Sequence, residues 1–309
     1  MLIARRHALH RARLGLSIVE ILVSMVVGGV VLALITMIAV RQQRLFTDLT
    51  DGVALSGQLR EAATILPIDL RGVSIAARDI REARDTSVEL RGTIASALVC
   101  DTIANGFVLA PTSEGASTYA SYLTTLNVGD TAWLYTPTDS TDDWQPFAIA
   151  SVGTSPSRQC ASRGPHLSDS VRVLPRVSIA LVAPPSPLVS AIGMPLRITR
   201  PARYSLYRAS DGAWYVGEKD WNTAAARFNT VQPVSGPFLS PALGGLTFTY
   251  LDTSGASMSS PVADTRAIAA IRISLRGQTK NLTRVVGSAS STGKRVDTAA
   301  INVLMHNRR

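Results

Sequence analysis

One uninterrupted apolar segment near the N-terminus constrains this chain more than any other feature. Residues 16–40 carry a single formal charge, that of Glu20. A helix of these 25 residues, with a rise of about 1.5 Å per residue, is about 37 Å long. That length is enough to cross a bilayer with some tilt, so the sequence predicts one transmembrane helix.

The charges around this segment predict its orientation. The preceding residues include Arg5, Arg6, Arg11 and Arg13 and no acidic residue. Cytoplasmic flanks of membrane helices are enriched in Lys and Arg, so we expect a cytoplasmic N-terminus and an exported C-terminal body. A cleaved secretory signal has an apolar core of about 7–15 residues followed by a small-residue cleavage site, which this segment lacks. An uncleaved signal anchor remains an alternative.

The carboxylate of Glu20 needs an explanation in either case. An acidic side chain at the centre of a membrane helix costs about 2.5–3.5 kcal/mol on insertion scales and usually marks a function. The alternative is that Glu20 lies near the cytoplasmic end of the span, where headgroup water reaches it.

The residues around this carboxylate form a recognisable motif. The sequence GLSIVE (15–20) follows a short basic leader and precedes the apolar segment. It resembles the prepilin signature of type IV pilins and type II secretion pseudopilins. The resemblance implies cleavage after Gly15 by a prepilin peptidase, with methylation of the new N-terminus at Leu16. The family usually has Phe after the glycine, so Leu16 is a departure from its pattern.

The resemblance also implies a role for Glu20. Cleavage exposes an ammonium group at Leu16, which Glu20 of a neighbouring subunit would neutralise inside an apolar filament core. A buried carboxylate requires such a partner. The implied partners are the prepilin peptidase, other pilin or pseudopilin subunits and an inner-membrane assembly platform, and the implied location is the bacterial inner membrane before assembly into a filament.

Two adjacent glycines, Gly28 and Gly29, interrupt the apolar helix. Each weakens a helix by about 1 kcal/mol relative to Ala. Small residues allow membrane helices to pack closely, which we favour; loosening of the helix during extraction from the bilayer is the alternative.

Beyond the membrane the helix is expected to continue through 41–66 as an amphipathic half. Apolar or small residues recur at helical spacing and predict the face that packs on the rest of the protein. They are Leu45, Leu49, Val53, Ser56, Ala63 and Leu66. Pro67 is expected to end the helix, which from 16 to 66 would be about 76 Å long.

The remaining residues, 67–309, have the composition of a β-rich head. Short apolar runs alternate with Gly, Pro, Ser and Thr, and the clearest hairpin joins 203–209 to 213–218. Further strands are expected at 131–135, 146–152, 246–252, 267–277 and 296–304. The predicted fold class is α+β, with four parts: leader 1–15, transmembrane half 16–40, amphipathic half 41–66 and head 67–309.

The C-terminal strands and the length refine the resemblance. The stretches at 244–255 and 267–279 are similar to the terminal strands of the W-type minor pilins and J-type minor pseudopilins. Most major pilins are shorter than this 309-residue chain, which favours a minor, tip-located or initiating subunit.

The charge balance argues only weakly for nucleic acid as a partner. Without the four leader arginines the chain has 27 basic and 22 acidic residues, a net charge of +5. The basic stretches 272–284 and 307–309 are suited to phosphate contact, but solvated strand faces and a basic tail explain them better.

Cys100 and Cys160 are the chain's two cysteines. In an oxidising exported setting they are expected to pair, which would stabilise the fold by up to about 4 kcal/mol; two buried thiols are the alternative.

Catalysis, cofactors and metals find little support in the sequence. No nucleophile elbow, P-loop or zinc-protease motif occurs, and His166 and His306 have no metal-ligand spacing. The acidic residues Asp139, Asp142 and Asp143 are suited to calcium, but a solvated loop is the plainer interpretation. Three function classes therefore stand in order: a filament subunit, a membrane-anchored adhesin or nucleic-acid receptor, and a tethered enzyme.

Overall fold

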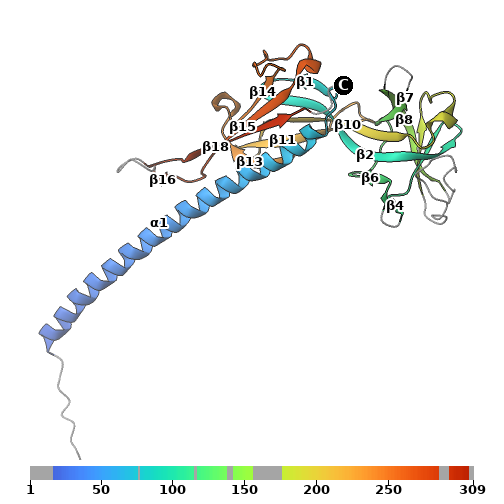
Figure 1. Cartoon of the computed structure of the whole chain (residues 1–309). Coiled ribbons are helices and arrows are strands. Elements are labelled where there is room, and N and C mark those ends of the chain that lie inside the picture. The colour runs from blue at the N-terminus through green and yellow to red at the C-terminus, as the bar shows by residue number, and fades with distance from the viewer. Residues whose placement is uncertain are drawn as a thin grey trace, which may run out of the picture.

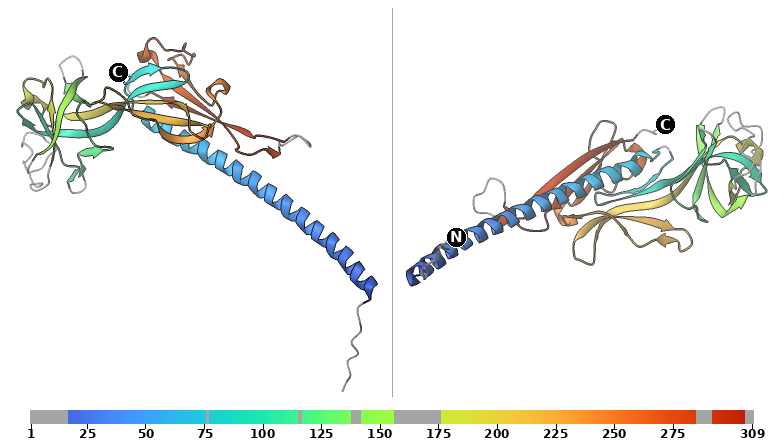
Figure 2. Two further views of the ribbon diagram at one scale, coloured as in Figure 1. Left: turned by 180° about the vertical axis from the view of Figure 1, so that it is seen from behind. Right: turned by 90° about the horizontal axis from the view of Figure 1, so that it is seen from below.

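The computed structural model describes residues 17–75, 77–114, 117–137, 142–155, 176–284 and 292–305. One helix, α1 (Ile18–Arg71), leads into an antiparallel β-rich head, and its N-terminal half projects free of that head (Figures 1 and 2). With 54 residues, α1 is about 81 Å long. The predicted α+β class, with a long N-terminal helix and an antiparallel head, is confirmed.

The predicted end of the helix is wrong. Pro67 lies inside α1, which continues for another turn to Arg71. A proline inside a helix costs about 3 kcal/mol because it removes one hydrogen bond and crowds the preceding turn. Here Leu66, Pro67 and Leu70 are all buried against the head, and the burial of Leu70 offsets that cost.

The predicted packing face of the helix is also wrong except at its end. The buried face is made by Leu55, Leu59, Ala62, Leu66 and Leu70, which follow the three- and four-residue spacing of a helix. In contrast, the predicted Leu45, Leu49 and Val53 are 60 %, 61 % and 73 % exposed. Two apolar rows therefore run along this part of α1, and the head covers only one of them.

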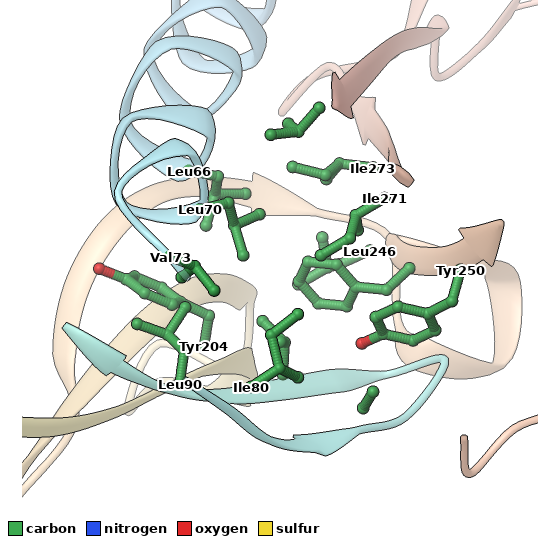
Figure 3. Packing of buried hydrophobic residues seen from close by; sticks show 14 of the residues in the cluster. Leu66, Leu70, Val73, Ile80, Leu90, Tyr204, Leu246, Tyr250, Ile271 and Ile273 are labelled. Carbon is green, nitrogen blue, oxygen red and sulfur yellow. The ribbon is translucent and has the colours of Figure 1, made fainter. Parts of the chain in front are cut away.

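The part of the head that packs on α1 is here called the proximal lobe. Its hydrophobic core joins the buried face of α1 to side chains such as Tyr204, Leu246, Tyr250, Ile271 and Ile273 (Figure 3). Its strands are β1 (Ile80–Ala83), the first half of β2 (Ser87–Ile103), the second half of β10 (Pro195–Arg208), β11 (Trp214–Asn222), β13 (Gln232–Phe238), β14 (Leu246–Leu251), β15 (Ala270–Gln278) and β18 (Val296–Leu304).

The other part of the head, here called the distal lobe, is a small antiparallel barrel. Successive pairing in the order β2–β3–β9–β8–β7–β10 closes because β10 also pairs with β2. The remaining members are β3 (Gly106–Leu109), β9 (Arg176–Leu181), β8 (Asp142–Ser155) and β7 (Thr131–Pro137), with β6 (Ala120–Tyr122) paired to β2 outside the ring. The core contains Phe107, Leu109, Leu134, Ile149 and Ile198, each at most 1 % exposed.

Short elements complete the described chain. They are β4 (Ser113–Glu114), β5 (Ser117–Thr118), β12 (Arg227–Phe228), β16 (Thr283–Arg284) and β17 (Thr292–Gly293), and the 3-10 helices η1 (Leu188–Ala191), η2 (Pro241–Leu243) and η3 (Thr265–Ala267).

Two long strands and a buried ion pair hold the lobes together. Strands β2 and β10 pair with each other from Ser87 to Leu98 and run through both lobes (Figure 1). Near the junction, Arg197 donates two hydrogen bonds of 2.9 Å to Asp79, whose side chain is fully buried. Among the described residues, the head that the sequence predicts as one unit is thus built on one large sheet with two main cores.

Candidate functional site: the uncovered half of the N-terminal helix

The head does not cover the first half of α1. Residues 17–47 are all exposed, including Ile18 at 79 % and Met25 at 74 %. Within the described chain, α1 is the one helix long and apolar enough to cross a membrane. Leaving so many apolar side chains in water is unfavourable, so this segment is built for a non-aqueous or protein environment.

Within the apolar span 18–40, two hydroxyls are hydrogen-bonded within the helix, and Glu20 is the one charged side chain. The hydroxyls of Ser24 and Thr36 donate to the carbonyls of Glu20 and Leu32 at 2.7 and 2.8 Å. These bonds allow both hydroxyls to enter an apolar environment at low cost. Glu20 forms no ion pair among the described residues and lies in the first turn of α1.

The first turn offers Glu20 a partial local partner. The N–H groups at a helix N-terminus are unsatisfied and carry a positive partial charge, which favours a nearby carboxylate. Helix α1 begins at Ile18, after the N-cap residue Ser17, whose side chain makes no capping bond. The predicted processing residues Gly15 and Leu16 lie outside the described residues, as does the leader.

No contact within the described structure requires a glycine at position 28 or 29. A Cβ atom built at either position meets no other atom within 4 Å. The helix continues through both despite their low helix propensity. The reason for these glycines is therefore to be sought in contacts with other chains or in the helix's own flexibility.

A cavity of about 710 Å³ at the junction of the lobes was not predicted from the sequence. Its wall includes Asp69 from the last turn of α1, Tyr204 from β10 and Glu218 and Asp220 from β11. Tyr204 donates a hydrogen bond to Asp69. Burial and then the charge of Asp69 raise the pKa of Glu218, and burial also raises the pKa of Tyr204. The residues that line this cavity come from segments over 130 residues apart, so no local sequence motif predicts it.

The remaining predicted residues are scattered. Cys100 is fully buried on β2 and disulfide-bonded, and it accepts a hydrogen bond from Arg176 at 2.6 Å. Cys160, Asp139, His166 and His306 lie outside the described residues. Asp142 and Asp143 belong to strand β8, not to a loop. Among the residues that are described, no group of three or more His, Cys, Asp or Glu is placed to hold a metal ion.

Aromatic side chains of the hairpin and arginines of the basic stretch 272–284 are engaged within the head. Tyr215 packs on Tyr207 across the hairpin, and Trp221 packs edge-on against Phe228. In the basic stretch, Arg272 donates to Asn302 and Arg276 donates to the carbonyl of Leu243. These contacts have the character of ordinary strand packing.

The uncovered apolar half of α1 thus carries the candidates Glu20, Gly28 and Gly29, whereas the other described candidates lie in the head. One helix able to span a membrane, on an exposed antiparallel head, is the arrangement of a membrane-anchored protein. No family model, curated protein or solved structure matches the chain, so this arrangement and the motif at 15–20 carry the functional argument.

Proposed function

We propose that this protein is a minor pilin-like subunit of a type IV filament system, cleaved after Gly15 and assembled through residues 16–40. The observation that carries the proposal is the uncovered first half of α1, with its one carboxylate in the first turn. The motif at 15–20, whose resemblance to the prepilin signature was described above, supports it.

The proposed assembly step is electrostatic. Before processing, the apolar half of α1 holds the precursor in the inner membrane, with the N-terminus cytoplasmic and the head exported. Cleavage would leave an ammonium group at Leu16, four residues before Glu20. Glu20 of an adjacent subunit would pair with that ammonium in an apolar filament core, where neither charge is stable alone.

The head supports a specialised position in the filament. The proximal lobe already buries one face of α1, and the distal barrel extends the head away from the helix (Figure 1). We place the subunit at the tip or at filament initiation, where a large distal lobe has room. A minor pseudopilin of type II secretion has the same design and is the alternative within this class.

Two other classes are kept as outcomes of the test. A membrane-anchored adhesin or nucleic-acid receptor would retain its leader and never enter a filament. A tethered enzyme would need a catalytic constellation, and we propose no catalysis, cofactor or metal for this chain.

The first experiment is intact-mass analysis of the protein purified from its membrane. We expect a chain that begins at Leu16 with one added methyl group. Replacing Gly15 with Val should block trimming because a branched side chain cannot enter the peptidase cleft as glycine does. Replacing Leu14 with Val is the matched control and should leave the mature mass unchanged. A chain that still begins at Met1 would refute the processing.

The second experiment tests the carboxylate. Glu20→Val should insert into the membrane normally but lower incorporation into filaments by tenfold or more, since loss of one partner of a buried pair costs about 3–5 kcal/mol. Ser24→Ala, one turn away, removes only a hydroxyl bonded within the helix and should assemble normally. Normal incorporation of Glu20→Val would exclude the proposed pairing.

A further inference from the structure

Strand β18 forms an edge of the proximal sheet. It pairs with β15 over nine consecutive residue pairs, from Ala270–Leu304 to Gln278–Val296, without a bulge. Among the described residues no strand pairs with its other side. The outer edge of β18 therefore presents backbone groups that the sheet does not use.

The residues whose backbone faces outward can be identified. Met305 donates its backbone N–H to Ala269, beyond the last ladder pair, which directs the odd-numbered residues of β18 towards β15. The even-numbered residues then direct N–H and C=O groups outward. In agreement, the N–H of Thr298 is taken by the side chain of Asp297 at 2.9 Å, outside the ladder. Ala300, Asn302 and Leu304 have no such cover in the described chain.

This edge lacks the usual protection against strand pairing. Exposed edges are normally blunted by charges, proline, bulges or short length. The stretch 298–304 contains no charged residue and no proline, and Leu304 is 61 % exposed. The edge is therefore suited to accept an added strand.

A groove adjoins the start of this edge. It has a volume of about 460 Å³ and lies between Arg295, which precedes β18, and one side of α1. The helix contributes Leu49, Val53 and Ser56 from its uncovered row, the two glycines Gly52 and Gly57, and two charged residues of opposite sign, Asp48 and Arg60. Helix α1 packs on β18, so an added strand would place its side chains in this groove where it passes the start of β18.

We propose that the outer edge of β18 and the groove beside it accept an extended segment from a different subunit of the same assembly, by strand addition. Main-chain hydrogen bonds to residues 300, 302 and 304 would supply the affinity, and the groove would select the side chains. The segment would carry small or apolar residues facing α1 and an acidic residue where it passes Arg60, since Arg295 is already paired with Asp297 at 3.8 Å. That the partner and this protein belong to the same assembly rests on the proposed function.

A second copy of this chain cannot pair its own β18 antiparallel with this edge. Antiparallel pairing of two β18 strands requires a two-fold axis perpendicular to the strands, which would reverse the second copy. Because β18 starts beside Gly52 and ends in the core with Leu66 and Leu70, it runs in the same direction as α1. Reversing β18 therefore reverses α1, and two such helices cannot enter one membrane from the same side.

The test uses the full chain in its own membrane. A benzophenone-bearing amino acid in place of Leu304 should yield a cross-linked adduct with another membrane-anchored subunit, identified by peptide mass spectrometry. The same group in place of Leu243, which is equally exposed at 57 % on η2, is the control and should not give that adduct.

A second substitution establishes that the contact is strand addition. Ala300→Pro removes an outward N–H and should lower the adduct yield by about tenfold or more, whereas Ala300→Val keeps the N–H and should preserve it. Should Ala300→Pro lower the melting temperature, Ser56→Trp replaces it, since it fills the groove without touching the backbone of β18.

Each result has a defined consequence. Adducts only with a second copy, no adduct, or an adduct that survives both Ala300→Pro and Ser56→Trp would overturn the inference. A retained leader together with a preserved adduct would refute the filament function and keep the strand-addition site. A trimmed leader without the adduct would refute the strand-addition site and keep the filament function.

Discussion

The apolar side chains in the two halves of α1 have opposite environments. Leu55, Leu59, Leu66 and Leu70 are at most 5 % exposed under the proximal lobe, whereas nothing in the described part of the chain covers residues 18–40. The first set stabilises the fold of one molecule. The second set does not stabilise that fold, and its apolar side chains can be buried only in a bilayer or against another subunit. The same physical force thus serves folding in one half and, under the proposed function, assembly in the other.

The largest expected effect tests this division directly. Leu66→Ala removes a fully buried side chain and should lower the free energy of unfolding by about 2–5 kcal/mol. Leu49→Ala, on the uncovered row, is the matched control and should change it by less than about 0.5 kcal/mol. Chemical denaturation of the detergent-solubilised protein measures both. Equal effects would mean that the two rows do not differ as described.

A smaller effect concerns the hydrogen bonds from Ser235 of β13 to helix α1. The hydroxyl of Ser235 lies 2.9 Å from the carbonyl of Gln58 and 3.1 Å from the carboxylate of Glu61. Ser235→Ala should cost about 1 kcal/mol of unfolding free energy, since it removes a net hydrogen bond. Thr64→Ala removes a hydroxyl that bonds only within the exposed face of α1, and it should cost less. A larger loss of unfolding free energy for Thr64→Ala would show that the Ser235 hydrogen bonds do not stabilise the packing of β13 on α1.

The smallest expected effect is a pH dependence at the end of the helix. Burial and the nearby Asp69 raise the pKa of Glu218, so the folded protein binds more protons than the unfolded chain above the ordinary value of 4.5. The contribution of Glu218 to stability is therefore greatest in acid and is lost as the pH rises through its raised pKa. Glu218→Gln should gain stability relative to the parent as the pH rises above about 4.5. Denaturation at a series of pH values measures this difference, and a pH-independent difference would contradict it.

Sequence reasoning located some strands well and missed others. The hairpin predicted at 203–209 and 213–218 is the end of β10 and the start of β11, and the pair at 131–135 and 146–152 lies within β7 and β8. The longest strand, β2, was not predicted. Its burial does not alternate over its whole length, because it passes from one core to the other and pairs on both sides. Local period cannot reveal such a strand.

The sequence by itself determined the anchor, the position of the carboxylate and the β-rich character of the head, because continuous hydrophobicity and composition are local properties. Only the tertiary structure decided which row of α1 the head covers. The two rows lie about a quarter of a turn apart and both have helical spacing, so periodicity alone cannot choose between them. The shape of the proximal lobe makes that choice and leaves the row from Leu45 to Val53 uncovered.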